Sequence, residues 1–224
     1  ELGRYLDLVV LYFVWGSTYL AIRVAVGEDG GFPPFTMGAM RALGRDGPTR
    51  LGTSDQQPNP PDQTRAGLLA LSGLLLWTGG NGLVMWAEQR AESSLAALLV
   101  GSMPIWVAVI GACLDRRPPT WLLVGALLTG FAGVSLLSAP TLGAGTRAGV
   151  LAIIALRLAP ISWGPGAILQ NHKPVELCIT ASSAYQHLFG GLGFLLLVLL
   201  TREPLPDPSP QAWWAGATWW CSAL

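Results

Sequence analysis

Long apolar stretches alternate with short polar connectors along the whole chain. They recur at 5–26, 66–87, 93–114, 119–139, 148–169 and 178–200, and another begins at 211. A bilayer core needs about 20 apolar residues of helix, at about 1.5 Å rise per residue. Several stretches meet that length, so the pattern predicts an all-α, polytopic transmembrane helical bundle with about seven to eight spans.

One region departs from this pattern. Residues 34–43 are apolar and follow Pro33, but they stop too early to cross a bilayer, so we treat them as a truncated second span. Residues 44–65 are rich in Gly, Pro, Asp and Gln, and this composition predicts a polar disordered insert. The chain starts at Glu1 and stops at Leu224 inside an apolar stretch, so we expect a fragment or a defective reading frame whose last spans are missing.

An internal repeat organises the spans. Trp-Gly-Ser at 15–17 recurs as Trp-Gly-Pro at 163–165, each time within an apolar helix. The span that begins near Ala66 aligns, at nearly the same offset, with the one that begins near Gln211. We therefore expect a first repeat at 1–140 and an incomplete second repeat at 147–224, with spans at about 148–169, 178–200 and 211–224. Five spans per repeat place the two halves in opposite orientations, which is typical of secondary transporters.

Composition and charge narrow the function classes. The chain is 51% hydrophobic and 12% charged, about half the charge of a soluble domain. A net charge of zero gives no basic field for nucleic acid. If 34–43 crosses, a cytoplasmic N-terminus places more positive charge inside than outside, as the positive-inside rule requires. The cytoplasmic side then holds Arg4, Arg45, Arg50, Arg65, Arg116, Arg117 and Lys173, against Arg90, Arg147 and Arg202 outside.

Several motifs together resemble EamA-type permeases of the drug/metabolite transporter superfamily. They are Trp15-Gly16-Ser17-Thr18-Tyr19, Pro33-Pro34-Phe35 with Met40-Arg41, Thr78-Gly79-Gly80-Asn81-Gly82-Leu83, and Ser94-Leu95-Ala96-Ala97-Leu98-Leu99 with Pro104-Ile105-Trp106. The resemblance implies ten transmembrane helices in two inverted five-helix repeats. It also implies export or exchange of small metabolites at a central site in the inner or plasma membrane.

Eight residues are candidates for the wall of a substrate cavity: Trp15, Tyr19, Arg41, Asn81, Trp106, Trp163, Gln186 and His187. Trp15 and Tyr19 lie one helical turn apart and could stack a substrate, although plain packing is the commoner role. Asn81 lies between two glycines, so a helix contact and a substrate contact fit equally well. Trp106 follows Pro104, and Trp163 is a candidate through its repeat symmetry with Trp15.

The charged and titratable candidates also have two interpretations each. Arg41 could attract an anionic substrate group, or it could extend to the cytoplasmic interface at the end of its short helix. His187, next to Gln186, could relay protons or form a hydrogen bond between helices. Glu88, Arg90 and Glu92 lie at a span end, where a solvated interfacial turn is the ordinary explanation.

The sequence thus predicts a small-molecule permease, with two alternatives. A truncated, non-functional remnant would have no packed place for 44–65, and a membrane scaffold or sensor would have no cavity. No enzyme constellation is present in the sequence, and we predict no cofactor and no metal. The expected partners are the lipid bilayer and a small molecule, with no nucleic acid, and a homodimer is left open.

Overall fold

The computed structural model describes residues 2–27, 31–46, 61–116, 118–143, 149–172 and 177–204, with short pieces at 206–207, 209–210 and 213–214. Within these ranges every regular element is a helix, as the sequence predicts. Most of the predicted span at 211–224 and most of the predicted insert lie outside the described residues.

The first two helices differ greatly in length. α1 runs from Leu2 to Val26 and is continuous over 25 residues. α2, Pro34–Arg41, begins with proline at its first position, where the missing N–H costs nothing. It continues into a π-helical turn, η1, at Ala42–Asp46. The second span is therefore short, as predicted, but its helix extends three residues beyond Leu43 into the segment expected to be disordered.

The third span contains a π-helical segment in its middle. α4, Gln63–Gly73, passes into η2, Leu74–Asn81, and then into α5, Gly82–Glu88. Asp62 caps this span, because its Oδ1 accepts the Arg65 backbone N–H at 2.8 Å. The predicted disorder at 63–65 is therefore wrong: those residues form the first helical turn, since a capping side chain stabilises them.

The fourth span is interrupted. α6, Ser93–Val100, and α7, Met103–Asp115, are separated by a turn at Gly101 and Ser102. Pro104 lies in the first turn of α7, where a proline ring fits without the loss of a helical hydrogen bond. The span predicted at 93–114 is therefore formed by two helices. α8 follows at Trp121–Gly143.

The last two described helices are long. α9, Val150–His172, contains Pro160 and Pro165. α10, Ile179–Thr201, is followed by Arg202 in the left-handed conformation, with a φ of 52°. Arg116 ends α7 in the same way, with a φ of 51°. α10 packs against α2, α4, η1 and η2, whereas α9 packs against α4, η2, α5, α6 and α7. The third span therefore lies between α9 and α10.

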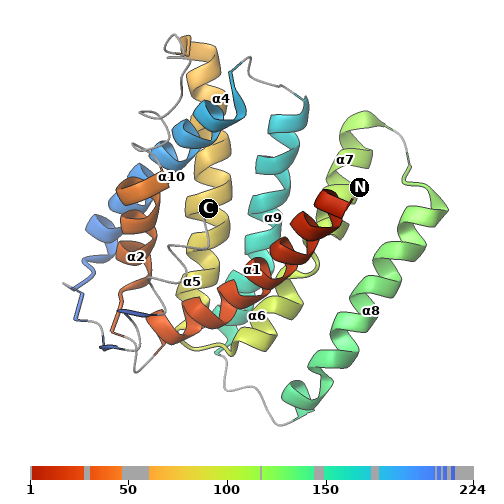
Figure 1. The fold of residues 1–224 in the computed structure, drawn as a ribbon, viewed down its shortest axis with the longest axis horizontal. Coiled ribbons are helices and arrows are strands. Elements are labelled where there is room, and N and C mark those ends of the chain that lie inside the picture. The colour runs from red at the N-terminus through yellow and green to blue at the C-terminus, as the bar shows by residue number, and fades with distance from the viewer. Residues whose placement is uncertain are drawn as a thin grey trace.

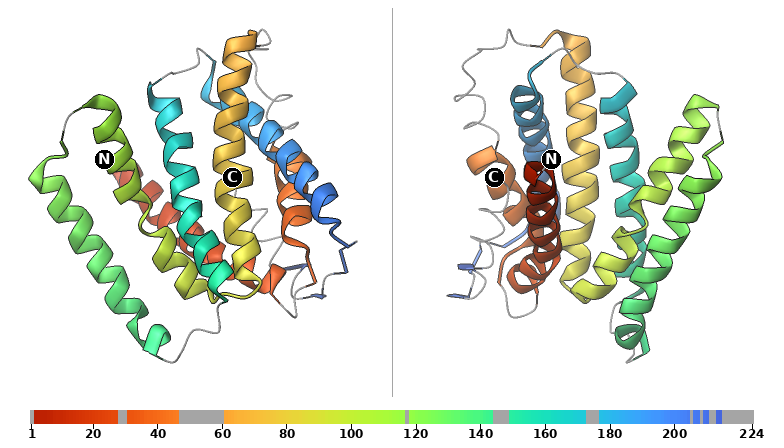
Figure 2. Two further views of the ribbon diagram at one scale, coloured as in Figure 1. Left: turned by 180° about the vertical axis from the view of Figure 1, so that it is seen from behind. Right: turned by 45° about the vertical axis from the view of Figure 1, so that its right-hand side comes forward.

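Figures 1 and 2 show the arrangement of these helices. The α4–α5 span stands near the middle, with α10 and α2 on one side and α9, α7 and α8 on the other (Figure 1). α1 crosses obliquely and contacts α5 and α6. α8 lies at the edge in every view, where it packs against α6 (Figure 2).

Two buried clusters hold the helices together. One joins α5, α6 and α9 and includes Ala87, Ala91, Leu156 and Trp163. The other joins α1, α2, α5 and α10 and includes Ile22, Met37, Met85 and Phe194. Many large apolar side chains, such as Leu122 on α8 and Leu199 on α10, face outward instead. Outward apolar faces are what a lipid environment requires.

Four helical segments in the described part of the chain are long and apolar enough to cross a membrane. They are Gln63–Glu88, Ser93–Asp115, Val150–Gln170 and Ile179–Thr201, and Trp121–Gly133 is a shorter apolar stretch. These segments agree with the spans predicted at 66–87, 93–114, 148–169 and 178–200. The chain is a multi-pass helical membrane protein.

Candidate functional site

The π-helical segment η2 lies in the middle of its span and makes different contacts on its two sides. A π-helix leaves some backbone carbonyls available for other partners and occurs frequently at functional sites. Toward α9, the Ser162 hydroxyl donates to the Leu75 carbonyl and the Trp163 indole N–H donates to the Leu76 carbonyl, both at 2.7 Å. Polar side chains of α9 are therefore anchored on consecutive η2 carbonyls.

Glycines allow this close approach. A Cβ atom added to Gly79 would overlap the Ser162 side chain, and one added to Gly80 would overlap the Trp163 ring. The Asn81 side-chain amide also donates to the Leu76 carbonyl, at 3.0 Å. The structure thus brings Asn81 and Trp163 together on one carbonyl oxygen. The Trp163 bond joins α9 to η2, whereas the Asn81 bond lies within η2 itself.

On the opposite side of η2, Trp77 lies between two candidate residues. The Arg41 guanidinium lies over the Trp77 ring, 5.4 Å from its centroid. The His187 ring packs on Trp77 with 4.1 Å between ring centroids and 40° between the planes. We call Arg41, Trp77 and His187 the mid-span stack. The sequence analysis selected Arg41 and His187 but not Trp77, which has no motif to mark it.

The mid-span stack shows the depth of Arg41. Trp77 lies near the middle of the 63–88 span, so Arg41 is half-buried there and does not reach the end of the span. The short helix α2 ends inside the bundle, which explains the difference from a residue at the interface. A guanidinium over an aromatic face is stabilised by about 0.5–2 kcal/mol.

One hydrogen bond of His187 lies within its own helix. Its Nδ1–H donates to the Ser183 carbonyl at 2.7 Å. The ring itself is buried and packs against Trp77 of the neighbouring span.

Gln186 lines a hollow of about 370 Å³ between the N-terminal half of α4, the end of α9 and the start of α10. Gln170 joins its wall, and its Nε2 donates to Ser72 Oγ at 3.1 Å and to Gln186 Oε1 at 3.3 Å. Ser182 and Ser183 add further hydroxyls. We call this the second hollow, to distinguish it from the first hollow described below. It offers neutral amide and hydroxyl groups on apolar walls, as small-molecule sites do.

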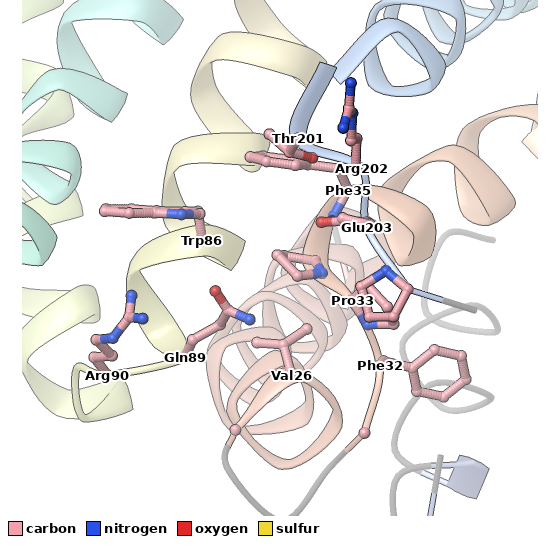
Figure 3. Close-up of a pocket in the computed structure, with 14 residues that line it drawn as sticks. Val26, Phe32, Pro33, Phe35, Trp86, Gln89, Arg90, Thr201, Arg202 and Glu203 are labelled. Carbon is pink, nitrogen blue, oxygen red and sulfur yellow. Dashed lines mark hydrogen bonds between the residues drawn. The ribbon is translucent and has the colours of Figure 1, made fainter. Parts of the chain in front are cut away.

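A first hollow, of about 510 Å³, opens at the other end of the bundle (Figure 3). It is lined by the end of α1, the start of α2, the end of α5 and the segment after α10, with Phe35, Trp86, Arg90 and Glu203 among its residues. The Glu203 carboxylate accepts the backbone N–H groups of Phe35 and Thr36 at 3.0 and 2.7 Å. It therefore caps the N-terminus of α2, where a negative charge is stabilising.

The remaining candidates lie away from the hollows. Trp15 is 57% exposed on the outer side of α1, and Tyr19, one turn on, packs on the α5–α6–α9 cluster. Trp106 approaches α9 at Gly164. The structure therefore gathers four of the eight candidates into two pairs, Asn81 and Trp163 at the Leu76 carbonyl and Arg41 and His187 at Trp77, whereas the other four lie outside these pairs.

Glu88 differs most from its expected position. It is 0% exposed, although the sequence suggested a solvated turn. Neither carboxylate oxygen has a hydrogen-bond partner among the described residues. The Arg23 guanidinium donates instead to the Glu88 backbone carbonyl. Sequence position could not reveal this burial, because it arises from α1 crossing the end of α5.

Comparison with known proteins places this arrangement in a broader context. Residues 5–139 match the model of the EamA-like transporter family, more than half of the chain. The chain is 28% identical, over 200 residues, to the uncharacterized inner membrane transporter YedA of Escherichia coli K12, covering 88% of this chain and 62% of that protein.

Two photosynthetic organisms have further relatives. The chain is 24% identical to the chloroplastic WAT1-related protein At3g02690 of Arabidopsis thaliana, covering 93% of this chain and 51% of that protein. It is 22% identical to the uncharacterized transporter sll0355 of Synechocystis, covering 93% and 66%. The chain thus spans about half to two thirds of the length of these relatives.

Proposed function

Because this chain belongs to the EamA-like transporter family, we propose that it forms part of a permease that moves a small metabolite or drug-like molecule across the inner membrane by secondary transport or export. The family consists of transporters and not enzymes, in agreement with the sequence analysis. One observation carries the proposal. The second hollow and the first hollow lie at opposite ends of the same helices, and the mid-span stack lies between them.

The second hollow is the proposed binding site. Its amide and hydroxyl groups would recognise a small polar molecule by hydrogen bonds, and its apolar walls would contact the rest of that molecule. Gln186 connects the second hollow to the mid-span stack, because it adjoins His187 on α10. Arg41 would attract an anionic group that moved deeper, because a cation within a membrane span typically faces a substrate pathway.

The wider architecture belongs to the same proposal. We expect two inverted five-helix repeats, the first at 1–140 and the second beginning near 147, and a cytoplasmic N-terminus. The family match ends at residue 139, close to the proposed boundary. The packing of α2 against α10 supports it too, because these are the second helices of the two proposed repeats. A homodimer remains a prediction.

The test is flux and binding with the purified chain. Reconstituted in vesicles, it should transport at least one member of a panel of labelled amino acids, nucleosides and small organic acids above protein-free vesicles. Gln186→Ala should weaken the binding of that compound about tenfold, the effect of losing roughly 1.4 kcal/mol.

The control is Gln63→Ala, which removes an exposed amide from the first turn of α4 and should leave binding unchanged. Equal effects of the two variants would remove the second hollow from the proposal. Binding without flux across the whole panel would favour a scaffold or sensor.

A further inference from the structure

Glu88 is a buried carboxyl group that the proposed binding site does not use. It is the last residue of α5, and it lies beside the first hollow without lining it, although Trp86, Gln89 and Arg90 do. Residues close to it along the chain, Val84, Ala87 and Ala91, are apolar and buried. No described donor reaches either of its carboxylate oxygens.

An ionised carboxylate is unfavourable in this position for two reasons. Burying a charge without a hydrogen-bond partner carries a large desolvation cost, and the group avoids that cost by taking up a proton. Glu88 also lies at the C-terminal end of a helix, where the negative end of the helix dipole repels a carboxylate. The surroundings therefore suit a carboxyl group that carries its proton.

The charged groups around Glu88 come from α1. Arg23 donates to the Glu88 backbone carbonyl, and Tyr19 lies close enough to sense the carboxylate charge. No ion pair joins Arg23 to the Glu88 carboxylate among the described contacts. Of the other elements packed on α5, η2 and α6 have no charged residue, α2 has Arg41 at the mid-span stack, and α9 has Arg157, which is exposed.

We propose that Glu88 is a proton-binding site, and that release of its proton accompanies separation of α1 from α5 beside the first hollow. In this step the O–H bond of the carboxyl group breaks, the proton passes to water, and water hydrates the carboxylate that remains once α1 no longer covers it. The proton site stands on the burial of Glu88 alone. Its role as the coupling ion rests on the proposed function.

The geometry favours a proton over a metal ion. A metal ion needs several ligands, and no group of three His, Cys, Asp or Glu side chains in the described part of the chain could hold one. Glu88 offers a single carboxyl group, which is sufficient for a proton because a proton needs one oxygen.

Carbodiimide labelling tests the proton site directly and requires no transport. Dicyclohexylcarbodiimide is apolar and reacts with protonated carboxyl groups, so it should label Glu88 in the purified chain near pH 7, where an exposed carboxylate with a pKa of about 4.3 is ionised. Glu92, which is exposed one turn further on, is the internal control. Peptide mass spectrometry should find the adduct on Glu88 and not on Glu92. Equal labelling of both residues would overturn the proposal.

A second measurement follows stability against pH. If Glu88 is protonated in the folded chain and ionised in the unfolded chain, the folded state binds one more proton. The free energy of unfolding then falls as pH rises above the pKa of a glutamate in the unfolded chain. Glu88→Gln keeps the shape of the protonated group and should flatten this dependence, whereas Glu92→Gln should not. A slope unchanged by Glu88→Gln would overturn the proposal. Failure of every flux assay would leave both measurements intact, so the two proposals are tested separately.

Discussion

The Leu76 carbonyl shows how single residues act in this fold. It accepts the Asn81 amide and the Trp163 indole, and both donors lie within a span where water cannot replace them. Sequence analysis identified both residues from local signals, the flanking glycines of Asn81 and the repeated Trp-Gly pair. It could not identify their common acceptor, because a backbone carbonyl has no sequence signature and depends on the π-helical register of η2.

The hydrogen bond from Trp163 can be tested by Trp163→Phe. This substitution keeps an aromatic ring but removes the indole N–H, and it should destabilise the folded chain by about 0.5–1.5 kcal/mol. The control is Trp106→Phe, because the structure gives the Trp106 indole no acceptor among the described residues. Unfolding in mixed detergent micelles would measure both. Equal losses would mean that ring size matters here and the hydrogen bond does not.

Single residues differ in how far their place in the site can be predicted from the sequence. Arg41 and His187 were found because charged and titratable groups are rare in apolar spans. Trp77, which joins them, was missed because one tryptophan among 10 carries no distinguishing pattern. Glu88 was misplaced because its burial depends on a helix 65 residues away in sequence.

At the scale of elements, hydrophobic length predicted the long helices and local chemistry decided their irregularities. The four long apolar helices lie where the pattern placed them, because an apolar run of that length has few other stable states. Gly101 and Pro104 are local signals for the break between α6 and α7, but the apolar run across them predicts a single span. The π-helical form of η2 depends on its partners α9 and α10, which the local sequence does not specify.

Close packing of α4 on α10 depends on Gly73. A Cβ atom there would overlap the Gln186 carbonyl oxygen and lie 3.0 Å from the Gln186 Cα, so backbone would have to move. We expect Gly73→Ala to destabilise the chain by about 1–3 kcal/mol, as overpacking does. Gly67 lies on the same helix with nothing within 4 Å of a Cβ, so Gly67→Ala should be neutral or stabilising by up to about 1 kcal/mol.

Thermal unfolding in detergent would compare the two alanine variants. Because Gln186 also lines the second hollow, Gly73→Ala should in addition weaken ligand binding there. A Gly73→Ala chain as stable as Gly67→Ala would show that α4 and α10 do not approach as closely as described.

At the scale of the whole molecule, the distribution of positive charge predicts which side of the membrane each hollow faces. The second hollow lies at the end of the bundle that contains the start of α4 and the start of α10, and the first hollow lies at the end that contains the close of α5. The excess of Arg and Lys predicted for the cytoplasm falls at the second-hollow end. The second hollow would therefore open toward the cytoplasm.

Cysteine accessibility tests this orientation. Cys113 in the last turn of α7 and Cys178 before α10 are both exposed, and these helix ends lie at the same end of the bundle (Figure 1). With Cys221 replaced by serine, single-cysteine chains bearing Cys113 or Cys178 should react with an impermeant maleimide in inverted vesicles only. Arg90→Cys in a cysteine-free chain places the probe in the turn after α5 and should react in right-side-out vesicles only.

The pattern of labelling distinguishes the fold from its orientation. Cys113 and Cys178 reacting from opposite sides would contradict the helix order itself, since α8 and α9 must together return the chain to the side it left. Both reacting from outside, with Arg90→Cys inside, would keep the fold and reverse it in the membrane. That result would mean that the excess of Arg and Lys at the second-hollow end does not decide the orientation of this chain, contrary to the positive-inside rule.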